Sequence, residues 1–221
     1  MSESTGAVTP RPGESLRDRK KRATRQLLSD TATELFLARG FGGVRVSEIA
    51  EACGVSEKTV FNYFPTKEAL VMDRLEGTTD ALLAALADPS LSPVEAALTV
   101  LAGELEAMTA QLGGEPDFRV TASRYSRFSE LLRSTPSLRA HQSAVAEHLT
   151  AEAARILAER GGTDPADPEP RITAAALLAL WPIQYRALER HLKTATTLDH
   201  LFETVTAEVR RAAAVLENGL A

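Results

Sequence analysis

The chain has 221 residues, of which 44% are hydrophobic and 25% charged, an ordinary composition for a globular protein with a substantial buried core. No apolar run reaches the roughly 18 residues that a membrane helix needs, and the first residues lack the basic-then-apolar order of a signal peptide, so we expect a cytoplasmic protein. A single cysteine, Cys53, excludes a framework of intramolecular disulfides.

Charge is distributed unevenly along the chain. The formal net charge is −5, but residues 1–70 hold 11 basic and 9 acidic side chains, whereas residues 71–221 hold 14 and 21. Within residues 11–25, seven basic side chains stand against two acidic ones. A basic end on an acidic body predicts that only the N-terminal part approaches an anionic partner such as nucleic acid.

The N-terminal third begins with a polar segment and a long helix. Residues 1–14 are rich in Ser, Thr, Gly and Pro and offer almost nothing to bury, which predicts a disordered arm. Apolar residues at helical spacing predict a first helix over residues 16–39, which Gly40 ends.

Residues 46–64, VSEIAEACGVSEKTVFNYF, predict two short helices joined by a tight turn. Helices that cross steeply tolerate only a small side chain at the crossing, which Ala50 supplies, and Gly54 can adopt the positive φ that the turn needs. The residues expected on the inward face are Ile49, Val55, Val60 and Phe64. The residues expected to point outward are Glu57, Lys58, Thr59, Asn62 and Tyr63. This outward set predicts a surface that contacts DNA bases and phosphates.

The stretches TRQLLSDTATELFLARGFGGV and IAEACGVSEKTVFNYFPTKEAL, within residues 20–75, resemble the DNA-binding domain of the TetR family of bacterial transcriptional regulators. The tail NYFPTKEAL is the most specific part of the match. The resemblance implies backbone contacts for Thr59, Tyr63 and Lys67, and it puts Phe61 where the family often has tyrosine; its ring could touch a thymine methyl.

Arg45 departs from the family pattern, which usually has a threonine that caps the next helix. Arginine cannot accept that hydrogen bond, so either Ser47 caps a helix that starts slightly later or Arg45 has turned toward the DNA backbone or minor groove. We favour the capping role of Ser47. The full set of expected DNA-binding residues is Arg45, Ser47, Ser56, Lys58, Thr59, Phe61, Asn62, Tyr63 and Lys67.

The rest of the chain also predicts helices, and no strand pattern competes. Pro65 ends the second short helix and residues 66–87 continue as a helix, while Ser92 and Glu95 form a capping box before another. Residues 163–170, TDPADPEP, predict a non-helical linker. The helices expected beyond residue 88 cover residues 92–111, 117–134, 135–161, 171–193 and 197–218.

We therefore expect an all-α protein with a disordered arm (residues 1–14), a helix-turn-helix DNA-binding domain (15–65) and a helical ligand-binding and dimerisation domain (66–221). Residues 171–193 are apolar nearly all round, which predicts cover on more than one side. Pro182 should kink or break this helix. In the TetR family the last two helices pack against those of a second copy, so the resemblance implies a homodimer.

The helical body also predicts an apolar pocket, because the resembled family commonly binds a small molecule there. The candidate lining residues are Leu105, Met108, Phe118, Arg124, Tyr125, Phe128, Trp181 and Tyr185. Ordinary core packing is the alternative for each apolar member. The segment RFSELLRSTPSLRAHQ resembles regulators of the mycofactocin type, whose ligands are long-chain acyl-CoAs; arginines beside an apolar tunnel would suit such a ligand, whereas a solvated, salt-bridged face is the other interpretation.

Other chemistry has little support. His141 and His148 should lie about 10 Å apart on one expected helix, too far to share a metal without further ligands, so we expect no metal site. No catalytic, phosphate-loop or dinucleotide motif occurs, so we expect no cofactor and no enzymatic activity. The sequence predicts a ligand-responsive transcriptional regulator, a repressor that binds a pseudo-palindromic operator. A helical small-molecule-binding or scaffolding protein with a degenerate DNA-binding head is the alternative.

Overall fold

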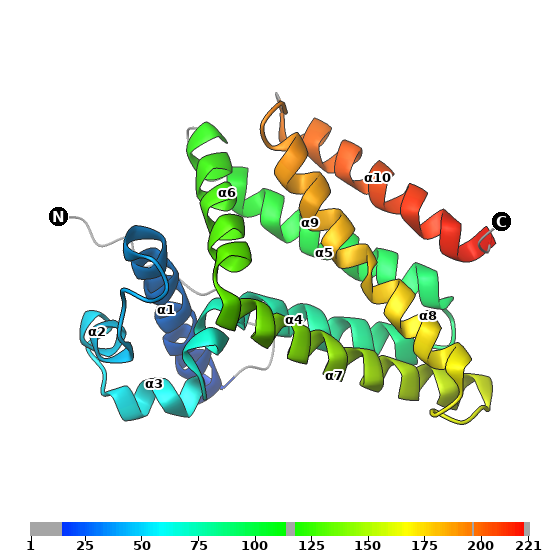
Figure 1. The fold of residues 1–221 in the computed structure, drawn as a ribbon, viewed down its shortest axis with the longest axis horizontal. Helices are drawn as coiled ribbons and strands as arrows, with labels where there is room; N and C mark the ends of the chain where they lie inside the picture. Colours follow the sequence, from blue (N-terminus) through cyan, green and yellow to red (C-terminus); the bar gives the residue numbers. More distant parts are fainter. Residues whose placement is uncertain (1–14, 114–117, 196, 219–221) are drawn as a thin grey trace. The chain divides into compact units, whose positions relative to one another are not determined.

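The structure is a computed structural model that describes residues 15–113, 118–195 and 197–218, without the side chains of residues 74–77, 111–113, 118, 119 and 121. The expected arm over residues 1–14 lies outside this part. The described residues form ten α-helices, so the all-α prediction is confirmed (Figure 1). The helices are α1 (Leu16–Arg39), α2 (Val46–Ala52), α3 (Glu57–Tyr63), α4 (Lys67–Ala87), α5 (Pro93–Gly113), α6 (Phe118–Ser134), α7 (Pro136–Gly161), α8 (Pro168–Leu178), α9 (Leu180–His191) and α10 (Leu198–Asn218).

The chain divides into two compact units, Met1–Asp73 and Arg74–Ala221, and the division falls inside α4. In the first unit, α1 to α3 and the start of α4 enclose one small apolar core. Ser15 caps α1, since its Oγ accepts the N–H of Asp18 over 3.1 Å. The fully buried members of the core are Leu28, Ala32, Phe36, Val44, Ile49, Val60, Phe64 and Leu70.

The tight turn between α2 and α3 follows the prediction from its residue types. Gly54 has φ +66°, a left-handed conformation that a side chain would strain, and Ala50 is buried where the two helices meet. Val60 is the residue of α3 that is buried, while Val55 in the turn is only half-buried. This short connection fixes α3 on the core through one side of the helix and leaves its other side exposed.

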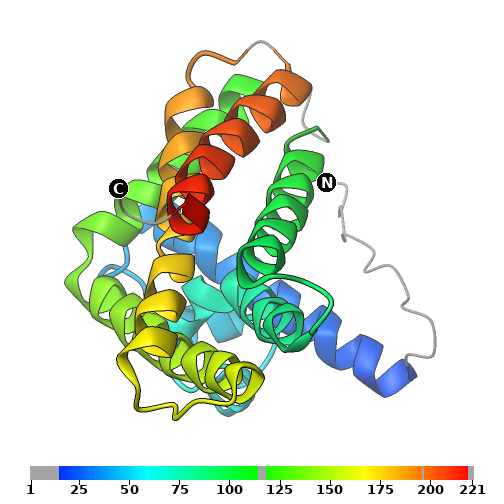
Figure 2. The same cartoon turned by 90° about the vertical axis from the view of Figure 1, so that its right-hand side faces the viewer.

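The second unit is a bundle of α5 to α10 with the second part of α4. In it α10 packs against α5 and α9, and α7 packs against α8 (Figures 1 and 2). The capping box that opens α5 is present: the N–H of Ser92 donates to Glu95 over 2.8 Å, and the N–H of Glu95 donates to Ser92 Oγ over 3.2 Å. Leu101, Leu105 and Leu177 are among the fully buried members of its core.

Two expectations about the C-terminal half need correction. The linker predicted over residues 163–170 is shorter, because α8 already begins at Pro168; proline has no N–H to leave unpaired in the first turn of a helix and its fixed φ suits that position. The segment expected as one helix over residues 171–193 is divided, as the predicted kink or break at Pro182 implied, because α8 ends at Leu178 and α9 begins at Leu180.

Pro182 accounts for this break. A continuous helix would need an N–H on Pro182 to donate to the carbonyl of Leu178, and proline has none. The interruption at Ala179 therefore lies one helical turn before the proline, and Pro182 itself sits in the first turn of α9.

Among the residues described, no helix combines the length and apolar character that crossing a membrane requires.

Candidate functional site

Arg45 is the N-cap of α2, which begins at Val46, so the expectation that Ser47 caps a later helix is wrong. The N–H of Arg45 donates to Glu48 Oε2 over 2.7 Å, and the Glu48 carboxylate thus closes the first turn in place of a side-chain acceptor at residue 45. Hydrogen bonds from the Arg45 backbone and the Arg39 side chain lower the pKa of Glu48. The side chain of Arg45 is 83% exposed, so its guanidinium faces solvent.

The second helix of the motif, α3, begins with a side-chain cap. Ser56 Oγ accepts the N–H of Thr59 over 3.1 Å and lies 2.8 Å from Thr59 Oγ1, so both hydroxyls are engaged at the start of the helix. Glu57 is acidic in the first turn, where a negative charge is favourable. Its role at the helix end explains an acidic residue beside a surface expected to face phosphates.

The exposed side of α3 carries the expected DNA-reading residues. Lys58 and Asn62 are exposed, and Phe61 is 47% exposed, which is unusual for so large an apolar side chain. Tyr63 is half-buried at the end of the helix. The structure therefore brings Lys58, Phe61 and Asn62 onto the solvent-facing part of one rigid helix.

Lys67, at the start of α4, is bound within the protein. Its Nζ donates to the carbonyl oxygen of Phe41 over 2.5 Å and lies 4.3 Å from the centre of the Phe41 ring and 5.3 Å from that of Phe36. Partial burial lowers the pKa of this ammonium group. Its expected contact with the DNA backbone stays a prediction.

Arg25 is a residue of this unit that the sequence analysis missed. From α1, its Nε donates to Asp73 Oδ1 over 2.5 Å and its Nη1 donates to the carbonyl oxygen of Tyr63 over 3.3 Å, while its guanidinium lies 4.7 Å from the centre of the Phe64 ring. Three helices are joined by this one side chain. Arg25 lies in the basic run over residues 11–25, which was interpreted as a whole as attracting phosphates. Its role was missed because its partners are distant in sequence.

The candidate ligand-binding residues lie in the second unit and differ in how deeply they are buried. Leu105 is fully buried in the core, Met108, Tyr125 and Trp181 pack against that core, Phe128 and Tyr185 are half-buried, and Arg124 is exposed. The side chain of Phe118 lies outside the described residues. The complete burial of Leu105 favours a packing role for that residue.

Two of the candidates, Trp181 and Tyr185, bind one half-buried carboxylate that the sequence analysis missed. Trp181 Nε1 donates to Glu104 Oε2 over 2.9 Å, and the Tyr185 hydroxyl donates to Glu104 Oε1 over 2.7 Å. Burial raises the pKa of Glu104, and the hydrogen bonds from Tyr185, Trp181 and Thr78 only partly offset that effect. We call Glu104, Trp181 and Tyr185 the carboxylate cluster.

Tyr125 belongs to the same surroundings. Burial raises the pKa of Tyr125, and the negative charges of Glu189 and Glu104 raise it further. Burial also raises the pKa of Tyr185, with an added effect from Glu104. A glutamate three residues after Leu101 and one before Leu105, inside an apolar stripe, was the sequence pattern that could have revealed this cluster.

In the part of the chain that the structure describes, no three His, Cys, Asp or Glu side chains lie close enough together to hold a metal ion. His141 is half-buried and His148 exposed on α7.

Known proteins resemble both units. Residues 28–72 match the family described as bacterial regulatory proteins, tetR family, and residues 105–217 match the MftR C-terminal domain. The chain is 32% identical over 191 residues to the HTH-type transcriptional regulator TcmR of Streptomyces glaucescens, which covers 86% of this chain and 82% of TcmR.

Two further similarities are more limited. The putative mycofactocin biosynthesis transcriptional regulator MftR of Mycobacterium tuberculosis is 42% identical over 59 residues, or 27% of this chain and 30% of that protein. A solved TetR-like transcriptional regulator from Rhodococcus sp. RHA1 aligns over 94% of this chain and 99% of its own, with 18% identity and a TM-score of 0.46.

Proposed function

The chain belongs to the tetR family of bacterial regulatory proteins and is a transcriptional regulator, and we propose that it represses transcription as a homodimer whose α3 helices read a pseudo-palindromic operator. Release from DNA follows binding of a small molecule in the second unit. Its place of action is then the cytoplasm, where the chromosome lies.

The observation that carries this proposal is the two-sided character of α3. Val60 and the adjoining Phe64 are about 1% exposed and hold the helix on the core, whereas Lys58, Phe61 and Asn62 face solvent. An amide such as Asn62 can donate to and accept from an adenine edge, while Lys58 suits a guanine or a phosphate. Ser56, Thr59, Tyr63, Lys67 and Arg45 then supply backbone contacts around the base-reading residues.

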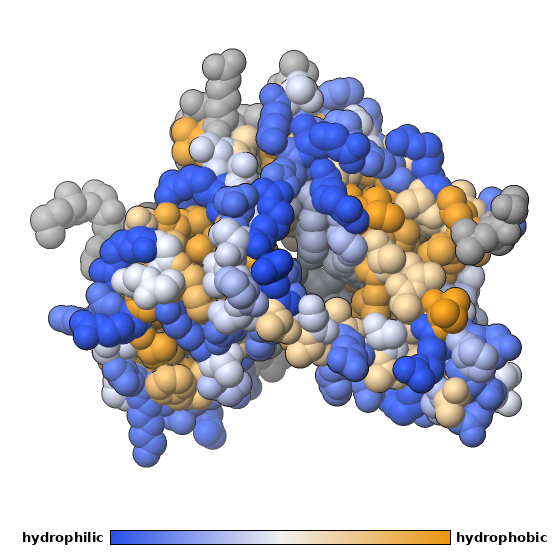
Figure 3. All heavy atoms as spheres, in the orientation of Figure 1, coloured by the Kyte–Doolittle hydropathy of each residue, from blue (hydrophilic) through white to orange (hydrophobic). Residues whose placement is uncertain are grey.

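The second unit offers a surface for a second copy. Ile172 on α8 is 69% exposed and Val215 on α10 is 47% exposed, and apolar surface gathers over α8 to α10 in Figure 3. Exposed apolar side chains on neighbouring helices are typical of an interface between subunits. Two copies related by a two-fold axis would present their α3 helices to successive major grooves, about 34–36 Å apart.

The carboxylate cluster supports a ligand-binding role for the second unit. A half-buried carboxylate bound by a tryptophan and a tyrosine can orient a polar group of a ligand whose remainder lies among Met108, Tyr125 and Phe128. Residues 105–217 match the MftR C-terminal domain, and because mycofactocin-type regulators, which this part of the chain resembles, take long-chain acyl-CoAs, we propose an amphipathic ligand of that kind. Binding shifts the protein toward the form with lower DNA affinity.

Footprinting on the DNA that flanks its own coding region tests the proposal. We expect a protected pseudo-palindrome, and we expect Asn62→Ala to reduce selectivity between operator and random DNA by about 1–3 kcal/mol. The same substitution at Asn218, which is exposed at the end of α10, serves as the control. Absence of any footprint at low salt would favour the alternative, a helical ligand-binding or scaffolding protein with a degenerate DNA-binding head.

A further inference from the structure

An open cleft of about 640 Å³ lies in the second unit, lined from α6, α9, α10 and the turn that follows α9. Its walls carry four basic side chains, two acidic ones and one apolar one, although residues 71–221 as a whole are acidic. The lining residues are Arg133, Ile183, Arg186, Glu189, Arg190, Lys193 and Glu208. We call this the basic cleft.

One stripe of α9 supplies most of the positive charge. Ile183, Arg186, Arg190 and Lys193 follow each other at steps of three and four residues, which places them along one side of the helix and its C-terminal turn. Like charges at such spacing repel one another. Three successive cations on one stripe are therefore unfavourable unless something negative lies against them.

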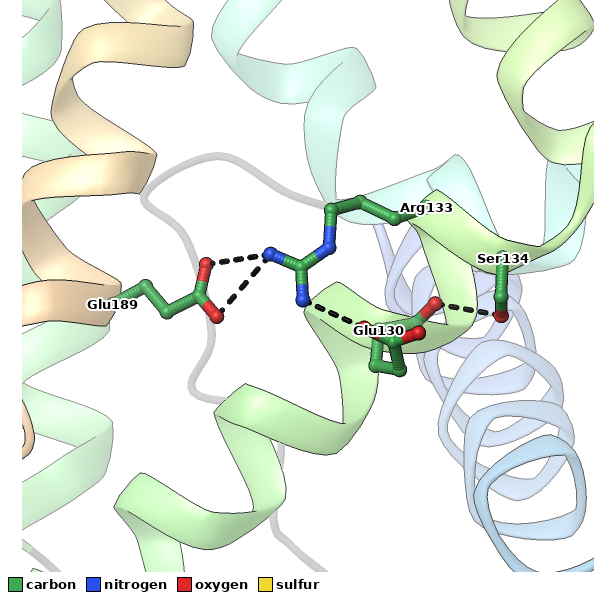
Figure 4. Close-up of polar contacts among 4 residues, drawn as sticks. All are labelled: Glu130, Arg133, Ser134 and Glu189. Atoms are coloured by element: carbon green, nitrogen blue, oxygen red, sulfur yellow. Dashed lines mark hydrogen bonds and ion pairs between the residues drawn. The ribbon is translucent and has the colours of Figure 1, made fainter.

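The carboxylates of the cleft form ion pairs with only some of these cations. Glu189, with an 18% exposed side chain, pairs with Arg133 over 3.1 Å, and the same guanidinium also binds Glu130 over 2.6 Å (Figure 4). Glu208, 21% exposed, pairs with Arg190 over 2.6 Å and with His191 over 3.2 Å. Burial alone would raise the pKa of Glu208, but the hydrogen bonds from Arg190 and His191 outweigh it and lower the pKa.

Arg186 and Lys193 keep their charge uncompensated. Arg186 Nε donates to the carbonyl oxygen of Pro182 over 3.0 Å, and among the residues described no carboxylate lies within ion-pair distance of Arg186 or Lys193. Both side chains are exposed. Even when Glu130 is counted, an excess of positive charge remains around the cleft.

A structural role at the helix end accounts for only part of this arrangement. Cations in the last turn of a helix are favourable because of the helix dipole, and Arg190 and His191 occupy that turn of α9. Arg186 lies one turn earlier and forms no ion pair within the described part of the chain. The helix dipole therefore does not account for Arg186, whereas a bound anion would.

We propose that the basic cleft is a binding site for an anion that carries two or more phosphate charges. The guanidinium groups of Arg133 and Arg190, oriented by Glu189 and Glu208, form one side, and Arg186 with Lys193 contributes the charge that the anion neutralises. Planar guanidinium groups suit phosphate oxygens. The chemistry is shared by a free polyphosphate and by the diphosphate of a nucleotide-type cofactor.

Isothermal titration calorimetry on the full chain tests the site, with inorganic tripolyphosphate in one arm and coenzyme A in the other. We expect 1:1 binding of tripolyphosphate per subunit that weakens with added salt, and about tenfold weaker binding in Arg186→Gln and in Lys193→Gln. Binding of tripolyphosphate alone identifies a free polyphosphate, and binding of both identifies a nucleotide-type diphosphate.

Arg155→Gln is the matched control, since Arg155 is an exposed arginine of α7 outside the cleft and its loss changes the net charge equally. An equal loss of affinity in this control would mean diffuse charge attraction and would overturn the proposal. Failure of both anions to bind in dilute buffer would overturn it as well. Thermal melts of the three variants verify that each is folded. No DNA enters the measurement, so this result is independent of the operator experiment.

Discussion

Arg25 in α1 and Asp73 in α4 form an ion pair at 2.5 Å whose side chains are 31% and 12% exposed. The same guanidinium donates to the carbonyl oxygen of Tyr63 at the end of α3. The orientation of α3, the helix proposed to read DNA, therefore depends on a residue that itself belongs to α1.

Removal of this ion pair should destabilise the first unit. Arg25→Met leaves Asp73 with a partly buried, unpaired charge, and we expect a loss of about 1.5–3 kcal/mol in the free energy of unfolding, measured by urea titration. Arg19→Met, an exposed change on the same helix, is the control and should have a far smaller effect. An unchanged urea midpoint in Arg25→Met would contradict the structural role of the pair.

Replacement of Arg45 should separate stability from DNA affinity. A threonine at this position can cap α2 with its own hydroxyl, so we expect Arg45→Thr to raise the free energy of unfolding by about 0.5–2 kcal/mol. Because the exposed guanidinium is lost, operator affinity should fall, and the slope of log affinity against log salt should become shallower by about one charge. A more stable variant with undiminished affinity would show that Arg45 does not touch DNA.

The pKa of Glu104 makes a specific contribution to the pH dependence of stability. Because burial raises this pKa above the ordinary value of 4.5, the folded state holds a proton that the unfolded state has already released. The free energy of unfolding should therefore decrease as the pH rises from 4.5 to the folded-state pKa of Glu104. Below that window the depressed pKa values of Glu48, Glu95 and Glu208 act with the opposite sign.

Glu104→Gln should remove the decrease above pH 4.5, as measured by urea titrations at a series of pH values. Glu106→Gln, exposed on the same helix, removes an equal charge and serves as the control. A decrease that persists unchanged in Glu104→Gln would mean that another group is responsible.

Charge placed on the apolar surface of α8 and α10 should prevent dimer formation. For Ile172→Glu combined with Val215→Glu we expect the mass of a single subunit by light scattering and much weaker operator binding, since two-fold contacts are lost. Val120→Glu changes a 58% exposed valine on α6 and should leave the mass of the parent protein unchanged. A dimer that survives the double change would place the interface elsewhere.

Sequence periodicity was sufficient to predict most helices, because the spacing of apolar residues and the capping residues that mark each helix lie within the helix itself or next to it. Gly54, Ser56 and the Ser92 to Glu95 capping box are local features, and local sterics and hydrogen bonding determine the backbone there. The same reasoning failed at Pro168, since a proline pattern by itself does not distinguish a linker from the first turn of a helix.

What the sequence alone determined is the all-α fold, the helix-turn-helix and the set of polar residues on the outer side of α3. Only the tertiary structure decided the partners of Arg25, the internal hydrogen bond of Lys67, the hydrogen bonds of Trp181 and Tyr185 to Glu104, and the gathering of cations in the basic cleft. The physical reason is the separation along the sequence: a cap or a turn is formed within a few residues, whereas the Arg25–Asp73 ion pair and the Tyr185–Glu104 hydrogen bond join positions 48 and 81 residues apart, and no local pattern encodes such a pairing.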